Sequence, residues 1–168
     1  MTTYCFSTEN WGRPQEEVSY LMELANQYFD DKREWYFAKG IKVNFMGRRD
    51  RLPQEFVKKM GLLEAKTKDC QNLSLTICVD YGGRDEIARI IAMGAKTEQE
   101  INKIIFENTP APDAIYRTGG ERRLSNFMLW QAAYSELFFN ETLFPELDSF
   151  ELDRILKEYR DRKRNFGK

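Results

Sequence analysis

The sequence contains no histidine among its 168 residues. Histidine is the usual general base near neutral pH, the base of Ser-His catalytic triads and a common ligand of zinc. Its absence excludes those triads and most zinc sites. Any catalysis by this chain must therefore use carboxylates, arginines, amides or a hard cation such as magnesium.

The sequence also has few cysteines and no excess of either charge. Cys5, Cys70 and Cys78 form no CxxC pair, and Cys5 and Cys78 lie within apolar runs. We therefore expect reduced thiols in the core rather than disulfides or metal ligands. The formal net charge of -1 argues against a surface built to bind nucleic acid.

Long apolar segments are missing as well. No run of about 18 apolar residues is present, so we expect no helix that spans a membrane. The first residues do not combine a basic stretch with a long apolar one, as a secretory signal does. The cytoplasm is therefore the expected location.

The composition that remains is that of a folded protein. Apolar residues make up 42% of the chain and charged residues 32%, which is typical of globular proteins. The length fits one domain over residues 1–168. Short β-rich runs alternate with longer helical patterns, which predicts an α/β fold with a mainly parallel sheet flanked by helices.

The hydrophobic periodicity assigns each run to a strand or a helix. The expected strands are Thr2–Ser7, Ile41–Gly47, Leu73–Val79, Ala114–Tyr116 and Glu136–Phe139. The expected helices are Pro14–Lys39, Pro53–Lys68, Arg84–Met93, Glu98–Glu107, Ser125–Tyr134 and Phe150–Phe166. The first long helix is apolar enough to line a hydrophobic binding site, although core packing explains its pattern more simply.

Three of the strands are followed by a polar or glycine-containing loop that leads into a helix. The loops span residues 6–14, 80–85 and 117–125. Because the carboxyl ends of parallel strands lie at one edge of a sheet, we expect the three loops to open on the same side. Their arginines, glycines and helix N-termini are suited to bind a diphosphate. Ser125 is expected to serve both as a helix N-cap and as a phosphate ligand.

Each loop also has a plainer explanation. Residues 82–83, two glycines, are typical of a turn, and residues 7–13 fit an ordinary loop as well as a site. Residues 117–125 bring three arginines, two glycines and a serine together, which favours a function.

Charged residues outside the loops allow similar alternatives. The run 48–51 is expected to be a solvated helix start, and 161–168 a solvated basic tail. Glu136 is either a surface residue or a magnesium ligand, and its spacing leaves both open.

The loops and the residues that follow them resemble a known family. The matching stretches are Phe6-Ser7-Thr8-Glu9-Asn10-Trp11-Gly12-Arg13-Pro14, Asp80-Tyr81-Gly82-Gly83-Arg84, and Arg117-Thr118-Gly119-Gly120-Glu121-Arg122-Arg123-Leu124-Ser125-Asn126-Phe127, continuing to Trp130-Gln131 and Tyr134-Ser135-Glu136-Leu137. They resemble the undecaprenyl diphosphate synthases of the cis-prenyltransferase family, in the same order and spacing and nearly end to end.

This resemblance implies an enzyme that condenses isopentenyl diphosphate onto an allylic prenyl diphosphate, such as farnesyl diphosphate, with cis geometry. It implies Mg2+ as the cofactor, with Glu136 near the metal, and usually a homodimer. Any membrane association would come from the lipid product. The implied substrate-binding residues are Ser7, Thr8, Glu9, Trp11, Arg13, Arg117, Arg123, Leu124 and Ser125.

The resemblance also implies a role for Asn10 in proton removal. An amide is a poor base in its own right. We therefore expect Asn10 to position a diphosphate or a water molecule that accepts the proton.

Three departures from the family pattern bear on activity. The family's N-terminal part, with an Asp-Gly-Asn-Gly-Arg phosphate loop whose aspartate holds magnesium on the allylic diphosphate, is not found in this sequence. Asp80 replaces the usual asparagine, and the usual Arg-Arg-Phe-Gly terminus is Arg164-Asn165-Phe166-Gly167.

These departures leave two kinds of protein to weigh. One is an active transferase whose further segment lies upstream or on a partner chain, in a homodimer or a heteromer. The other is a non-catalytic diphosphate-binding subunit or an inactive fragment that needs a partner. In both cases the chain alone is expected to bind better than it catalyses.

Overall fold

A computed structural model describes residues 1–107 and 109–163. The chain divides into two compact units, Met1–Glu86 and Ile87–Lys168, and each is described by itself. Among the described helices none is long and apolar enough to cross a membrane.

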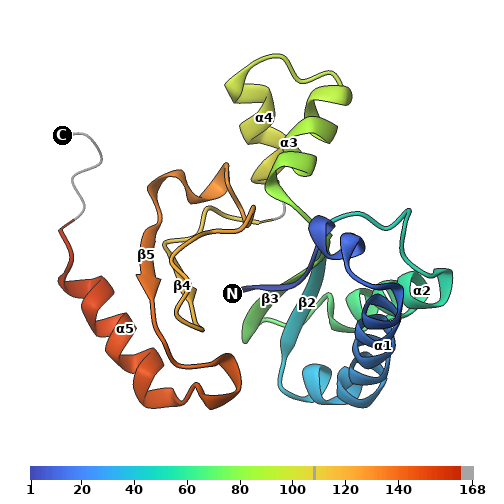
Figure 1. The fold of residues 1–168 in the computed structure, drawn as a ribbon, viewed down its shortest axis with the longest axis horizontal. Coiled ribbons are helices and arrows are strands. Elements are labelled where there is room, and N and C mark those ends of the chain that lie inside the picture. The colour runs from blue at the N-terminus through green and yellow to red at the C-terminus, as the bar shows by residue number, and fades with distance from the viewer. Residues whose placement is uncertain (108, 164–168) are drawn as a thin grey trace. The chain divides into compact units, whose positions relative to one another are not determined.

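The first unit is a three-stranded parallel sheet packed against two helices (Figure 1). Its elements are β1 (Thr2–Ser7), α1 (Gln15–Ala38), β2 (Ile41–Met46), α2 (Gln54–Thr67) and β3 (Leu73–Tyr81). The strands lie in the order β1-β3-β2, so the last strand in sequence is central. Every residue from Leu75 to Tyr81 is buried, as the apolar pattern of this strand predicts.

The core of the first unit lies between the sheet and the two helices. The Phe29 ring on α1 packs 5.1 Å from the Phe45 ring and 5.4 Å from the Phe56 ring, measured between centroids. The buried Thr67 hydroxyl at the end of α2 accepts a hydrogen bond from Val43 N at 3.0 Å. These contacts hold α1 against β2 and α2, and the end of α2 against β2.

The second unit contains a parallel pair of strands, β4 (Ala114–Arg117) and β5 (Glu136–Phe139), with α5 (Ser149–Asp161). Helix α4 (Glu98–Ile105) begins at a capping box, in which Thr97 and Glu100 bond each other's backbone N–H. Helix α3 (Gly83–Ala92) runs across the boundary of the two units. A small apolar core joins α3 to α4, made by Ile90, Ala95, Ile101 and Ile105 with Trp130 against it.

The α/β class, the parallel pairing and the flanking helices are confirmed, and nearly all elements begin and end within two residues of their predicted bounds. In the described residues the strands form two parallel sheets, of three and of two strands, rather than one. The single domain over residues 1–168 stays a prediction. The tail helix was predicted to reach Phe166, but α5 ends at Asp161. The terminus at residues 164–167 lies outside the described residues.

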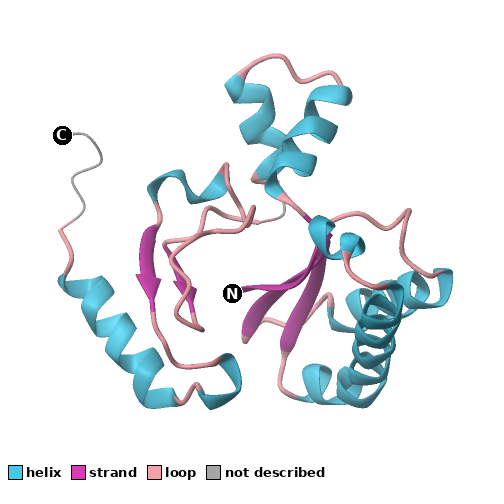
Figure 2. Ribbon diagram, viewed as in Figure 1, coloured by secondary structure: helices cyan, strands magenta, loops and turns pink. Residues whose placement is uncertain are grey.

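The helix predicted at Ser125–Tyr134 is wrong. Ser125, Asn126 and Met128 have φ angles of 48°, 64° and 45°, which a right-handed helix does not allow. Only Gln131–Tyr134 makes a helical turn, of the 3-10 type, and Figure 2 shows the rest as loop. Ser125 is therefore no N-cap, because no right-handed helix begins at it and its φ of 48° departs from the extended backbone of an N-cap. Its hydroxyl accepts a hydrogen bond from Arg117 Nη1 on β4.

The cysteines are free thiols, as expected, but they do not share one environment. Cys78 on β3 is fully buried, whereas Cys5 on β1 is exposed. Burial raises the pKa of the Cys78 thiol well above its usual range, so this group stays protonated. The core position expected for Cys5 is wrong, since this side chain falls on the exposed side of its strand.

Candidate active site

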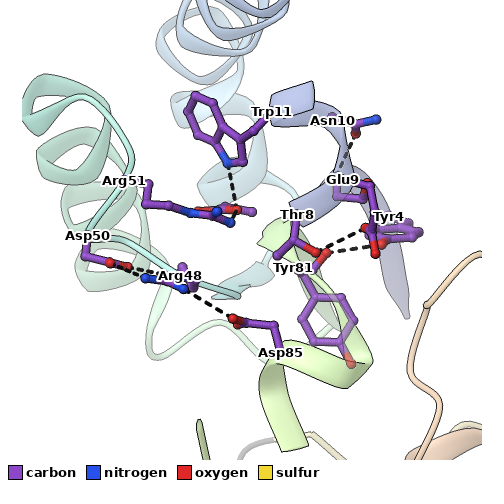
Figure 3. Close-up of polar contacts among 12 residues, drawn as sticks. Tyr4, Thr8, Glu9, Asn10, Trp11, Arg48, Asp50, Arg51, Tyr81 and Asp85 are labelled. Atoms are coloured by element: carbon purple, nitrogen blue, oxygen red, sulfur yellow. Dashed lines mark hydrogen bonds and ion pairs between the residues drawn. The ribbon is translucent and has the colours of Figure 1, made fainter. Parts of the chain in front are cut away.

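The loop after β1 is a single-turn 3-10 helix, Thr8–Gly12, which carries most of the predicted residues of the first unit. Its Asn10 side chain is held by the backbone, because Ser7 N donates to Asn10 Oδ1 at 2.8 Å. Asn10 Nδ2 donates to no acceptor in the described part of the chain, and Figure 3 shows the amide nitrogen turned away from its neighbours. Asn10 is thus fixed in place with N–H donors available to a ligand.

Two charged residues, one within this turn and one directly after it, pair with near neighbours. Thr8 Oγ1 donates to Glu9 Oε2 at 3.1 Å, and Arg13 Nη1 lies 2.6 Å from Glu17 Oε1 on the first turn of α1. Both pairs are largely exposed, and such pairs contribute little to stability. The Arg13 guanidinium can therefore exchange its carboxylate for a phosphate at small cost.

Trp11, in the same turn, is hydrogen-bonded to a carboxylate at the end of β3. Its indole Nε1 donates to Asp80 Oδ1 at 2.8 Å, and its ring lies 5.2 Å from that of Phe6. Asp80 is fully buried and has a φ of 49°. Arg51 Nε donates to Asp80 Oδ2 at 2.9 Å, and Arg51 Nη2 bonds Oδ1.

The other arginines of the run 48–51 are also paired, so its assignment as a merely solvated segment is wrong. Arg48 Nη2 lies 2.5 Å from Asp50 Oδ2, and its Nη1 lies 3.2 Å from Asp85 Oδ1. The hydrogen bond from Arg48 lowers the pKa of Asp50 to about 2. Arg49 Nη2 contacts both oxygens of Glu64, at 2.8 and 3.0 Å.

In the second unit, Arg117 gathers the glycine-rich loop around its guanidinium. Arg117 Nη1 donates to Ser125 Oγ at 2.8 Å and to the carbonyl oxygen of Arg123. Two glycines with positive φ bring the loop backbone against the next segment: Gly119 N donates to Thr142 O at 2.9 Å and Gly120 N to Asn140 O at 2.8 Å. The structure therefore brings Arg117, Arg123 and Ser125 together in one exposed loop.

The remaining predicted residues of this loop take supporting places. The Arg123 guanidinium pairs with Glu121, and both side chains are more than half exposed. Leu124 is half-buried, and its carbonyl accepts a hydrogen bond from Phe127 N at 3.0 Å. The loop's cationic groups thus lie at the surface, where an anionic ligand could replace Glu121.

Glu136 opens β5 and is paired with an arginine from the end of α5. Arg162 Nη1 lies 2.5 Å from Glu136 Oε2, and its guanidinium carbon lies 4.1 Å from the centroid of the Phe138 ring. The bonds to Glu136 and then to Glu158 raise the pKa of Arg162. Glu136 is therefore a partly buried acid with a cationic partner, rather than an isolated surface residue.

Carboxylates do not gather into a metal cage in the described part of the chain, where no group of three His, Cys, Asp or Glu residues could hold an ion. Mg2+ commonly binds through one or two carboxylates together with water and substrate phosphates. Glu136 fits the role of such a single carboxylate, and a metal there would compete with Arg162.

Sequence patterns missed Arg51 and Arg162. A signal existed for the first, because an aspartate between Val79 and Tyr81 in a buried strand needs a cationic partner, and the run 48–51 follows the neighbouring strand. The common rim predicted for all three loops stays a prediction.

The folds and loops described above define an α/β protein with cationic loops after its strands, suited to anionic ligands. The family described as "Putative undecaprenyl diphosphate synthase" matches residues 1–167. The chain belongs to this family, the cis-prenyltransferases.

Individual relatives agree with that assignment. An isoprenyl transferase of Aquifex pyrophilus is 43% identical, over 100% of this chain and 76% of the relative. A ditrans,polycis-undecaprenyl-diphosphate synthase, described as specific for (2E,6E)-farnesyl diphosphate, from Xanthomonas axonopodis pv. citri is 39% identical over 99% of this chain and 70% of its own length.

Two solved structures superpose closely on the chain. The crystal structure of a probable undecaprenyl diphosphate synthase from Campylobacter jejuni aligns with a TM-score of 0.91 at 37% identity, covering 99% of this chain and 82% of that one. Lavandulyl diphosphate synthase from Lavandula x intermedia, in complex with dimethylallyl diphosphate, aligns with a TM-score of 0.90 at 29% identity, covering 99% and 78%.

Proposed function

We propose that this chain condenses isopentenyl diphosphate with an allylic prenyl diphosphate, such as farnesyl diphosphate, in cis geometry to make a polyprenyl diphosphate. The observation that carries the proposal is the loop in which Arg117 joins the Arg123 backbone to the Ser125 hydroxyl. Arginine side chains and a hydroxyl at one exposed point suit a diphosphate head group. These residues lie in the stretch that resembles the isopentenyl diphosphate site of the family.

The reaction requires a carbon–carbon bond to form as the allylic carbon–oxygen bond breaks. The diphosphate leaves with the electron pair of that bond, and the isopentenyl unit then loses a proton. Asn10 is assigned to hold a diphosphate oxygen or a water molecule where it accepts this proton. The support is that the backbone fixes Asn10 Oδ1, while Nδ2 has no acceptor among the described residues.

Ser7, Thr8, Glu9, Trp11 and Arg13 are proposed to contact substrate from the loop after β1. Arg13 has the best-defined role, since its guanidinium at the start of α1 can pair with a phosphate. Leu124 is proposed to pack beside the isopentenyl group. The allylic diphosphate bound by the structural relative in lavender is a ligand of the same chemical class.

Mg2+ is proposed as the cofactor, with Glu136 as a carboxylate available to it. When bound, the ion neutralises charge on diphosphate oxygens. A homodimer and a cytoplasmic location belong to the same proposal. The relatives carry the names of enzymes, a transferase and a synthase, which favours an enzyme over a non-catalytic subunit.

The test measures incorporation of labelled isopentenyl diphosphate into farnesyl diphosphate by the purified chain with Mg2+. Calorimetry with isopentenyl diphosphate alone provides a separate measure of binding. We expect incorporation, and an Arg123→Ala variant that binds isopentenyl diphosphate about 10-fold more weakly or worse.

Arg160→Ala is the matched control, because Arg160 is an exposed arginine on α5 outside the proposed site. It should leave both measurements unchanged. Binding without any incorporation would overturn the proposal that this chain catalyses the condensation by itself, and would favour a diphosphate-binding subunit that needs a partner. Unchanged binding by Arg123→Ala would overturn the assignment of this loop.

A further inference from the structure

Asp80 is a fully buried carboxylate at the end of β3, directly before the turn that starts α3. Its backbone has a φ of 49°, a conformation that non-glycine residues rarely adopt. Moving a carboxylate out of water costs several kcal/mol unless it is paired and hydrogen-bonded. The fold therefore depends on what surrounds this side chain.

The partners of Asp80 come from two other loops. Arg51, before α2, bonds both carboxylate oxygens, and Trp11, before α1, donates its indole N–H to Oδ1 at 2.8 Å. The Arg51 guanidinium carbon also lies 5.7 Å from the centroid of the Trp11 ring. Asp80 on β3 thus joins the loops that follow β1 and β2, which carry Trp11 and Arg51.

The backbone reinforces this junction. Arg48 N donates to Asp80 O at 3.0 Å, so the loop before α2 is bound to Asp80 through its main chain as well. Gly47 lies so close to β3 that an added Cβ would stand 2.0 Å from Val79 O. Arg51 consequently approaches Asp80 from a loop with little freedom to move.

Trp11 transmits this arrangement to the proposed substrate loop. It directly follows Asn10 in the single turn Thr8–Gly12, and its ring packs on Phe6 of the core. A displacement of the indole can therefore be passed to Asn10 through the backbone of this short turn. Displacements of about 1 Å in a reacting group can lower a rate by roughly 100-fold.

We infer that Arg51 is a positioning residue, which neutralises the buried Asp80 and through Trp11 holds Asn10 in its reactive place. The inference rests on the proposed function. It assigns the guanidinium of Arg51 to the buried carboxylate of Asp80 rather than to a substrate diphosphate. It also explains how an aspartate occupies the position where the family motif usually has asparagine, because Arg51 compensates the added charge.

The first measurement follows the three tryptophan indole N–H signals by 15N NMR, with Trp11→Phe used to assign the Trp11 signal. Arg51→Met should shift the Trp11 signal and speed its hydrogen exchange, while the Trp130 signal, bonded to Asn102 at 2.7 Å, stays in place. Arg49→Met is the matched control, since Arg49 belongs to the same run 48–51 but pairs with Glu64 on α2. It should leave the Trp11 signal unchanged.

The second measurement separates kcat from KM. Arg51→Met should lower kcat roughly 10- to 100-fold while KM for isopentenyl diphosphate changes less than about threefold. Arg51→Lys should recover part of the loss. The double change Arg51→Met with Asp80→Asn removes both charges and keeps an amide oxygen for the indole, so it should return kcat and the Trp11 signal close to their original values.

The outcomes distinguish the inference from its alternatives. A lower kcat with an unmoved Trp11 signal, or a large rise in KM alone, would mean that Arg51 acts on the substrate and would overturn the inference. An unchanged kcat in folded Arg51→Met would do the same. If Arg51→Met does not fold, the double variant provides the test. A Trp11 signal in the double variant that differs from that of the parent chain would contradict the charge pairing of Arg51 and Asp80. If the parent chain shows no turnover, the proposed function fails while the NMR comparison still tests the junction.

Discussion

The two loops that carry the candidate site are held in different ways. In the first unit, the turn with Asn10 rests on a buried aspartate whose charge is balanced by Arg51. In the second unit, the loop of Arg117 is bound by its own residues and by two glycine N–H groups, and its charged side chains are exposed. The first loop therefore depends on the packing of the interior, whereas the second depends on surface interactions that salt screens.

The largest effect should come from Gly47→Ala, which disrupts the packing that supports the first loop. The φ of Gly47 is 129°, and a Cβ there would stand 2.0 Å from Val79 O. The β2–α2 loop must move away from β3, taking Arg51 with it, so we expect a loss of unfolding free energy of about 3 kcal/mol or more. Urea unfolding followed by circular dichroism measures the change.

Gly61→Ala is the control for that experiment. Gly61 lies inside α2, where an added Cβ meets no atom within 4 Å. Alanine should stabilise this helix by roughly 0.5–1 kcal/mol. Similar losses in both variants would contradict the tight approach at Gly47.

The exposed loop is tested by Arg117→Ala. Removing the guanidinium releases the Arg123 carbonyl and the Ser125 hydroxyl together. We expect isopentenyl diphosphate to bind about 30-fold more weakly, or about 2 kcal/mol, as calorimetry would show. The free energy of unfolding should change by less than about 1 kcal/mol, because the loop is exposed.

A contrary result for this loop would be a large loss of stability with unchanged affinity. The binding measured at low and at high NaCl sharpens the comparison further. Affinity carried by exposed arginines should fall as salt is raised. The Trp11 indole signal should keep its position over the same range, because Asp80 and Trp11 are bonded inside the first unit.

The smallest expected effect is the pH dependence of the stability that the Arg48–Asp50 pair contributes. The pKa of Asp50 is lowered to about 2 by the hydrogen bond from Arg48. A lowered pKa in the folded state means that the pair stabilises the fold above about pH 4 and loses this contribution as pH falls towards 2. The stability difference between the parent chain and Asp50→Asn should accordingly shrink over that range. Because the pair is exposed, the difference should be small and should also shrink at high salt. A difference that grows on acidification would contradict the assignment.

Much of the fold followed from sequence periodicity. Strands such as Thr2–Ser7 and helices such as α1 depend on local alternation and on capping residues, which a sequence displays directly. The segment Ser125–Tyr134 could not be predicted in the same way. It is held by a guanidinium from β4 and by the bond between Trp130 and Asn102, which are contacts with residues outside the segment.

The sequence by itself determined the α/β class, the family, and which loops hold the polar residues, because these properties are written in local patterns and motifs. Only the tertiary structure decided that Arg51 neutralises Asp80 and that Arg162 pairs with Glu136. Partners of a charge depend on which strand ends and helix ends become neighbours, and that arrangement arises when the sheet is assembled.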